Sequence, residues 1–113
     1  MTRRVNTKRR RWPPRKEELE ALVEDAIVDA YGESEQRSGF HAKLLDRLTL
    51  PFETNVLGAT VTVERIDLTD ADEIVALCRR GRHRQRVPIL DLPLPTPPPE
   101  GAEWIEAYRH WHG

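Results

Sequence analysis

Carboxylates are crowded into one short stretch in the middle of the chain. Residues 67–73 contain four acidic side chains and no basic one: Asp67, Asp70, Asp72 and Glu73. Oxygen ligands from several carboxylates suit Ca²⁺, and a bound cation relieves the repulsion among them. The spacing does not fit an EF-hand loop, which needs a glycine and a final glutamate at fixed positions. The stretch is a candidate calcium site of another kind, and a solvated acidic loop is the alternative that composition alone favours.

A second pair of acids, Glu33 and Glu35, stands at the junction between two expected helices, beside Tyr31 and Gly32. Acidic side chains in the first turn of a helix interact favourably with the positive end of its dipole. Spacing alone therefore favours a structural role for this pair. A role as metal ligands is the alternative.

Arginines cluster around a predicted hairpin turn that follows the acidic stretch. The cluster comprises Arg79, Arg80, Arg82, Arg84 and Arg86. The last three alternate in sequence and are predicted to share one face of a strand. Guanidinium groups suit phosphate, so a nucleic-acid site is one interpretation. Aromatic residues that could stack on bases are sparse here, and a charged strand edge that blocks aggregation is the simpler interpretation.

The sequence contains few residue patterns that are typical of other kinds of functional site. Glycine-rich phosphate loops, HExxH and GxSxG are all absent from the sequence, so we expect no enzyme activity. His110 and His112 are two residues apart on an expected helix, so they point to different sides and cannot share a metal ion. The single cysteine, Cys78, excludes an internal disulfide and is typical of a reducing cytoplasm. No apolar run has the length of a membrane span.

Basic and acidic residues occupy separate stretches of the chain. Their charges nearly cancel, which gives a net charge of −1 over 113 residues. Residues 3–16 carry only basic charges, and residues 17–35 carry only acidic ones. We predict that residues 1–12 form a disordered basic arm, because they lack apolar periodicity and their like charges repel. Such an arm could bind nucleic acid or an acidic partner. Residues 13–113 are predicted to form a single small domain.

Two helices are predicted to precede the acidic stretch. The first has an apolar stripe at helical spacing and is expected to end at Gly32: Leu19, Leu22, Val23, Ala26, Ile27, Ala30 and Tyr31. The second is expected to begin with Ser34 as its capping residue. It should end before Pro51, because proline disfavours helix at the residue before it.

From residue 52 onward, the spacing of apolar residues changes from the period of a helix to the period of a strand. Four strands are predicted, at residues 52–57, 60–68, 74–80 and 83–90. Hairpins between them suggest an antiparallel meander that curls into a barrel-like (SH3-like) sheet of four or five strands. A proline-rich spacer at 93–99 and a helix at 101–111 should follow. The expected fold class is therefore α+β.

An ordered set of segments resembles a small prokaryotic family of calcium-binding proteins first recognised in cyanobacteria. The resemblance covers residues 15–111, and its main segments are 28–36, 39–40, 50–53, 56–58, 66–74, 78–81, 89–92 and 104–109. It implies a compact fold that binds Ca²⁺ through clustered carboxylates, without an EF-hand and without catalysis. Carried over residue by residue, it implies metal ligands among Glu33, Glu35, Asp67, Asp70, Asp72 and Glu73.

The leading functional prediction is therefore a monomeric, cytoplasmic calcium buffer or sensor. A second hypothesis is a nucleic-acid or ribonucleoprotein accessory that uses the arginine hairpin and the basic arm. A third hypothesis is a protein-interaction adaptor without a ligand.

Overall fold

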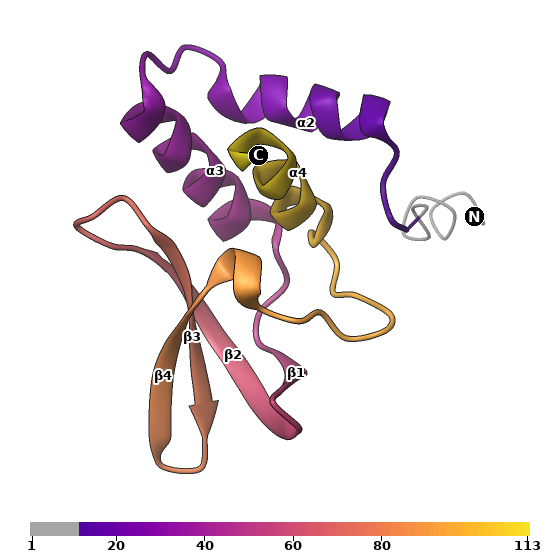
Figure 1. Ribbon diagram of the computed structural model, residues 1–113, viewed down its shortest axis with the longest axis vertical. Coiled ribbons are helices and arrows are strands. Elements are labelled where there is room, and N and C mark those ends of the chain that lie inside the picture. Colours follow the sequence, from indigo (N-terminus) through magenta and orange to yellow (C-terminus); the bar gives the residue numbers. More distant parts are fainter. Residues whose placement is uncertain (1–11) are drawn as a thin grey trace.

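The computed structural model describes residues 12–113, so the predicted basic arm lies outside the described residues except for its last member, Trp12. The elements follow in the order α2 (Lys16–Ile27), α3 (Glu33–Arg47), β1 (Phe52–Val56), β2 (Ala59–Leu68), β3 (Ile74–Arg80), β4 (His83–Pro88), the short 3-10 helix η1 (Ile89–Asp91) and α4 (Glu103–His112). The three α-helices gather at one end, and the sheet extends away from them (Figure 1). No helix within residues 12–113 combines the length and the apolar character needed to cross a membrane.

The junction between the first two helices differs from the prediction. Helix α2 ends at Ile27 rather than at Gly32, because Val28 leaves the helical conformation with ψ 133° and Asp29 follows it with a left-handed backbone, φ 61°. Tyr31, expected on the apolar stripe, is 81% exposed. Ser34 does not cap α3, since that helix begins at Glu33 after Gly32, and no side chain caps it.

The four strands form one antiparallel sheet in chain order, β1-β2-β3-β4. The register of β2 against β3 shifts between Val63 and Arg65, which places a bulge at Glu64. The predicted α+β class, with two helices before the sheet and one after it, is confirmed. The predicted barrel closure is wrong, because the edge strands β1 and β4 do not pair and the sheet stays open.

The core lies between one face of the sheet and helices α3 and α4. Its fully buried members come from each of these elements, and the largest are Phe40, Leu44, Val63, Ile66, Ile74, Ile89 and Ile105. Helices α2 and α3 cross so closely that a Cβ atom on Gly39 would overlap the carbonyl oxygen of Ala26. The helical end of the molecule is therefore tightly packed.

The proline-rich segment 93–99 is more than a spacer. Its main chain packs on the sheet, since the hydroxyl of Thr54 donates a 2.6 Å hydrogen bond to the carbonyl oxygen of Pro93. Leu92 is buried, and Leu94 packs against the core. This segment covers part of β1 before the chain enters α4.

Candidate metal centre

The acidic stretch forms the turn between β2 and β3, at residues 69–73. Thr69 organises this turn, because its main-chain N–H donates to Glu73 O and its hydroxyl oxygen accepts from the N–H groups of Ala71 and Glu73. The N–H of Asp72 donates to Thr69 O, and Asp72 itself has φ 63°. A short polar side chain tolerates this left-handed conformation better than a bulky one does. The turn therefore holds its shape through its own hydrogen bonds, without using its carboxylates.

For three of the four predicted acidic ligands, the part of the chain that the structure describes provides no partner for the carboxylate. Within residues 12–113, Asp70, Asp72 and Glu73 form no ion pair and no side-chain hydrogen bond, and Asp70 and Glu73 are exposed. Asp67 differs, since its carboxylate accepts a 3.0 Å hydrogen bond from Arg65 Nε and is half-buried. The turn thus offers free oxygen donors of the kind that Ca²⁺ prefers.

The second predicted pair lies in the first turn of α3. Glu35 accepts a 2.7 Å hydrogen bond from the main-chain N–H of Tyr31, so it stabilises the start of the helix. Glu33 is exposed. One helical turn further on, Arg37 reaches across to the acidic turn, where its Nη1 donates to Asp72 O at 3.2 Å. Figure 1 shows the β2–β3 turn on the same side of the molecule as the start of α3.

Basic side chains surround the acidic turn. A surface depression of about 880 Å³ is bordered by Asp67, Asp70 and Glu73 together with Arg86 and His41. His41 is half-buried, with its Nε2 3.0 Å from the carbonyl oxygen of Ile66. The depression is therefore not purely acidic, and the guanidinium of Arg86 partly screens its carboxylates.

The structure brings the two predicted groups of acids to one side of the molecule but does not gather them around a point. Within the described residues, no three His, Cys, Asp or Glu side chains are grouped as metal ligands. Arg37 lies one helical turn from Glu33, but its contact with the acidic turn could not be predicted from the sequence. The only signal was this spacing.

Electrostatic effects connect the acidic turn to helix α4. Burial raises the pKa of the Tyr108 hydroxyl, Arg37 opposes this rise, and Glu73 adds to it. The Arg37 guanidinium also lies 5.7 Å from the centre of the Trp111 ring, whose Nε1 donates to Gln36 Oε1 at 3.1 Å. A change of charge at the turn would therefore alter the electrostatic environment of Tyr108 and Trp111, two aromatic residues of α4.

The five arginines around the β3–β4 hairpin are divided between two faces of the sheet. Arg79 and Arg84 both bond to the carboxylate of Glu64. That contact lowers the pKa of Glu64, chiefly through the hydrogen bond from Arg79, while partial burial opposes the change. Arg86 follows Arg84 on the same face, and Arg82 lies in the turn. Arg80 lies on the opposite face, so the cluster is not a single continuous phosphate-binding surface.

Comparison with known proteins points to one family. A model of the CcbP family, described as calcium binding, matches residues 20–112. The match includes the acidic turn, Glu33 and Glu35 of α3, and the whole sheet. No curated protein and no solved structure gives a significant match to this chain. The matched range covers most of the sequence, and the chain therefore belongs to this calcium-binding family.

Proposed function

We propose that this protein is a non-catalytic calcium sensor whose ion is held at the β2–β3 turn. The ligands in this proposal are the carboxylates of Asp70, Asp72 and Glu73, completed by Asp67 and by Glu33 and Glu35 from α3. The observation that supports it most directly is the set of three carboxylates that have no partner among the described residues, on a turn that Thr69 holds in shape. Membership of a calcium-binding family supplies the identity of the ion.

The donor chemistry of these residues fits Ca²⁺, because all six side chains offer oxygen and the turn adds main-chain carbonyls. Binding requires local rearrangement, since the six carboxylates do not converge in the structure. Arg37 is the residue most affected. Its guanidinium bonds to Asp72 O, and it would be repelled by a divalent cation at the turn.

The contacts of Arg37 favour a sensor over a buffer. A sensor must change a distant surface when its ion binds, whereas a buffer needs no such change. Arg37 contacts the acidic turn through Asp72 and lies over the ring of Trp111 in α4. Movement of this one side chain would therefore alter the packing at the end of α4.

Calorimetric titration of the purified chain with CaCl₂ tests the location of the ion. We expect binding by the wild type and a loss of at least about tenfold in affinity for the double variant Asp70→Asn/Asp72→Asn, which removes two charges and keeps the side-chain size. The control is Glu17→Gln/Glu24→Gln, which removes two charges from residues of α2 that form no ion pair within residues 12–113. Equal losses in the two double variants would mean that the overall field, and not coordination at the turn, attracts the ion.

Tryptophan emission during the same titration tests the sensor hypothesis. We expect calcium to change the emission of the wild type, and we expect most of that change to disappear in Trp111→Phe while the calorimetric affinity is kept. Trp104, buried in the core, serves as the internal comparison. Calcium binding without any change in Trp111 emission would favour a buffer.

A further inference from the structure

The core face of the sheet is not fully covered by the helices. Residues that alternate onto this face are buried in the middle of β3, at Ile74, Ala76 and Cys78. Further along, the same face carries Arg80, and on β4 it carries His83 and Gln85. The helices lie at the other end of the molecule (Figure 1). This face of the sheet therefore extends beyond the region that the helices cover.

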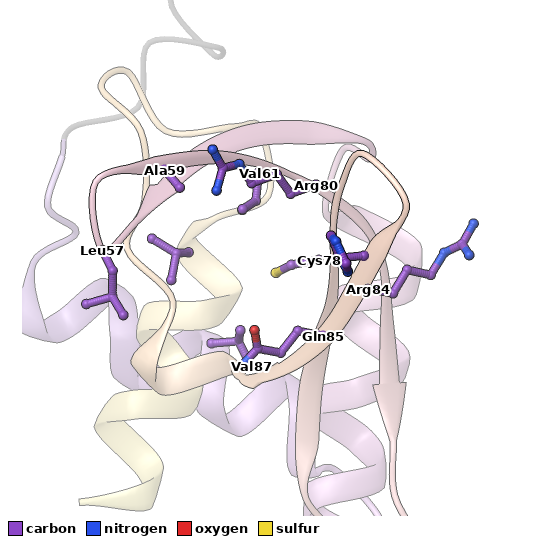
Figure 2. A pocket seen from close by; sticks show the side chains of 10 residues that line it. Leu57, Ala59, Val61, Cys78, Arg80, Arg84, Gln85 and Val87 are labelled. Carbon is purple, nitrogen blue, oxygen red and sulfur yellow. The ribbon is translucent and has the colours of Figure 1, made fainter.

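A pocket of about 300 Å³ occupies this uncovered end, between the unpaired strands β1 and β4. Its walls are the half-buried side chains of Val56, Val61 and Val87, and the sulfur of Cys78 points into it (Figure 2). Figure 2 also shows Arg80 extending across the pocket toward Val61, whereas Arg84 points away from it. We call this pocket the sheet-end slot. Its volume is at the lower end of the range of about 300–1,000 Å³ seen for ligand pockets, so it suits a single apolar group.

Leu57, at the edge of the slot, has an exposure and a backbone conformation that are unfavourable in the protein without a bound partner. Its side chain is fully exposed at the tip of the β1–β2 hairpin. Its backbone is left-handed, with φ 51°, a conformation that bulky residues rarely adopt. Neither the exposure nor the backbone strain benefits the isolated fold, and strained residues of this kind concentrate at functional sites.

The charge around the slot is basic. Within residues 12–113, Arg80 and Arg82 form no ion pair, and no carboxylate is among the described residues that line the slot. The slot therefore combines aliphatic walls with the guanidinium group of Arg80, which no described carboxylate neutralises. The complementary ligand carries an apolar side chain flanked by carboxylates.

We propose that the sheet-end slot binds an acidic segment of a partner protein, which inserts one aliphatic side chain beneath Arg80 and contacts Leu57. A nucleic acid is less complementary, because no Phe, Tyr or Trp lines the slot and unpaired bases bind chiefly by stacking on aromatic rings. The slot and the acidic turn lie at opposite ends of β2. This ten-residue strand is roughly 30 Å long, so the two sites are spatially separate.

The test uses two synthetic peptides, Glu-Glu-Leu-Glu-Glu and Glu-Glu-Ser-Glu-Glu, and the full chain labelled with ¹⁵N. Titrations at low salt contain a chelator, so that calcium cannot bridge the peptide and the acidic turn. We expect the leucine peptide to bind several-fold more tightly than the serine peptide. Its shifts should be concentrated in the amides of 56–61 and 78–87.

Two variants and a matched control locate the contact. Arg80→Glu should weaken binding of the leucine peptide by about tenfold or more, and Leu57→Ser should weaken it several-fold. Both side chains are exposed, so the fold should be kept, and the unperturbed amide spectrum checks this. Arg47→Glu reverses the same charge on an exposed arginine of α3 and should leave the affinity unchanged within about twofold.

Four outcomes would overturn the proposal. They are no detectable binding of the leucine peptide at millimolar concentration, equal binding of the two peptides, an equal loss in Arg47→Glu, and tighter binding of oligo(dT) through the same amides. The last outcome would instead support the nucleic-acid hypothesis for the arginine hairpin. Because the chelator removes calcium throughout, none of these results depends on where calcium binds.

Discussion

Arg37 and Asp72 are 35 positions apart in sequence, and the guanidinium of Arg37 donates directly to the main-chain carbonyl oxygen of Asp72. Through this contact, the positively charged side chain of Arg37 connects the start of α3 to the acidic turn. It also partly offsets the negative charge of the turn, where three carboxylates have no partner within residues 12–113. The same contact that stabilises the turn without calcium should therefore compete with calcium.

Replacing Arg37 with glutamine should raise the affinity for calcium. A divalent ion and a guanidinium about 5 Å apart in water repel by about 1.7 kcal/mol, so removal of the charge should tighten binding by about tenfold. Calorimetric titration measures the change, and Arg47→Gln is the control for general loss of a positive charge. An unchanged or weaker affinity in Arg37→Gln would place the ion away from Asp72.

Gly39→Ala should destabilise the fold even though alanine is the better helix former. Intrinsic propensity in α3 would favour alanine by about 1 kcal/mol. The added Cβ would overlap the carbonyl oxygen of Ala26, so α2 and α3 would have to move apart. We expect the free energy of unfolding to fall by about 2 kcal/mol in urea denaturation. Ser38→Ala, at the exposed neighbouring position, should be neutral or slightly stabilising, and an equally stable Gly39→Ala would contradict the close crossing of the helices.

Glu64→Gln should be less stable than the wild type at neutral pH, and the difference should shrink in acid. The hydrogen bond from Arg79 lowers the pKa of Glu64 below its usual value of 4.5. A carboxyl whose pKa is lowered by folding stabilises the fold above its unfolded pKa, and this contribution is lost as the pH falls through the folded pKa. Urea unfolding at neutral pH and below pH 4.5 compares the two proteins. Glu53→Gln, exposed on β1, should show no such pH-dependent difference.

Trp104→Ala should destabilise the protein by about 3 kcal/mol or more, because this side chain is only 3% exposed and its truncation leaves a cavity. Thermal unfolding measures the loss, and calcium binding should change only through the unfolded fraction. Trp12→Ala, which truncates a side chain that is 39% exposed, should have a much smaller effect. A Trp104→Ala protein that melts like the wild type would indicate that α4 is not part of the core.

The strands could be predicted almost to the residue because strong local signals delimit them. Gly58 and Gly81 adopt positive φ at the two hairpin tips, as expected of glycine in tight turns. The end of α2 was harder to predict, because Asp29 and Gly32 both tolerate a left-handed conformation and glycine is the stronger signal. Both residues have a positive φ in the structure, but the helix already ends before Asp29.

Closure of the sheet could not be predicted from alternation alone, because closure depends on the spatial separation of β1 and β4. One signal was nevertheless present. Arg80 is in phase with Ala76 and Cys78, and Gln85 is in phase with Val87, so polar residues continue the core face where a closed barrel would be apolar. For the acidic turn, the sequence predicted the clustering of carboxylates but not the contact of Arg37 with Asp72, which depends on how α3 packs against β2.

The packing of α4 against α2 and α3 has a consequence for synthesis of the protein. The sheet pairs only neighbouring strands, so its hairpins can form soon after each emerges from the ribosome. The helical layer cannot be completed in this way, since Ile105 and Tyr108 fill the space beneath α2 and α3 only after residues 103–112 have been made. Until then, the apolar faces of α2 and α3 stay exposed on the nascent chain, and chaperone binding should concentrate there.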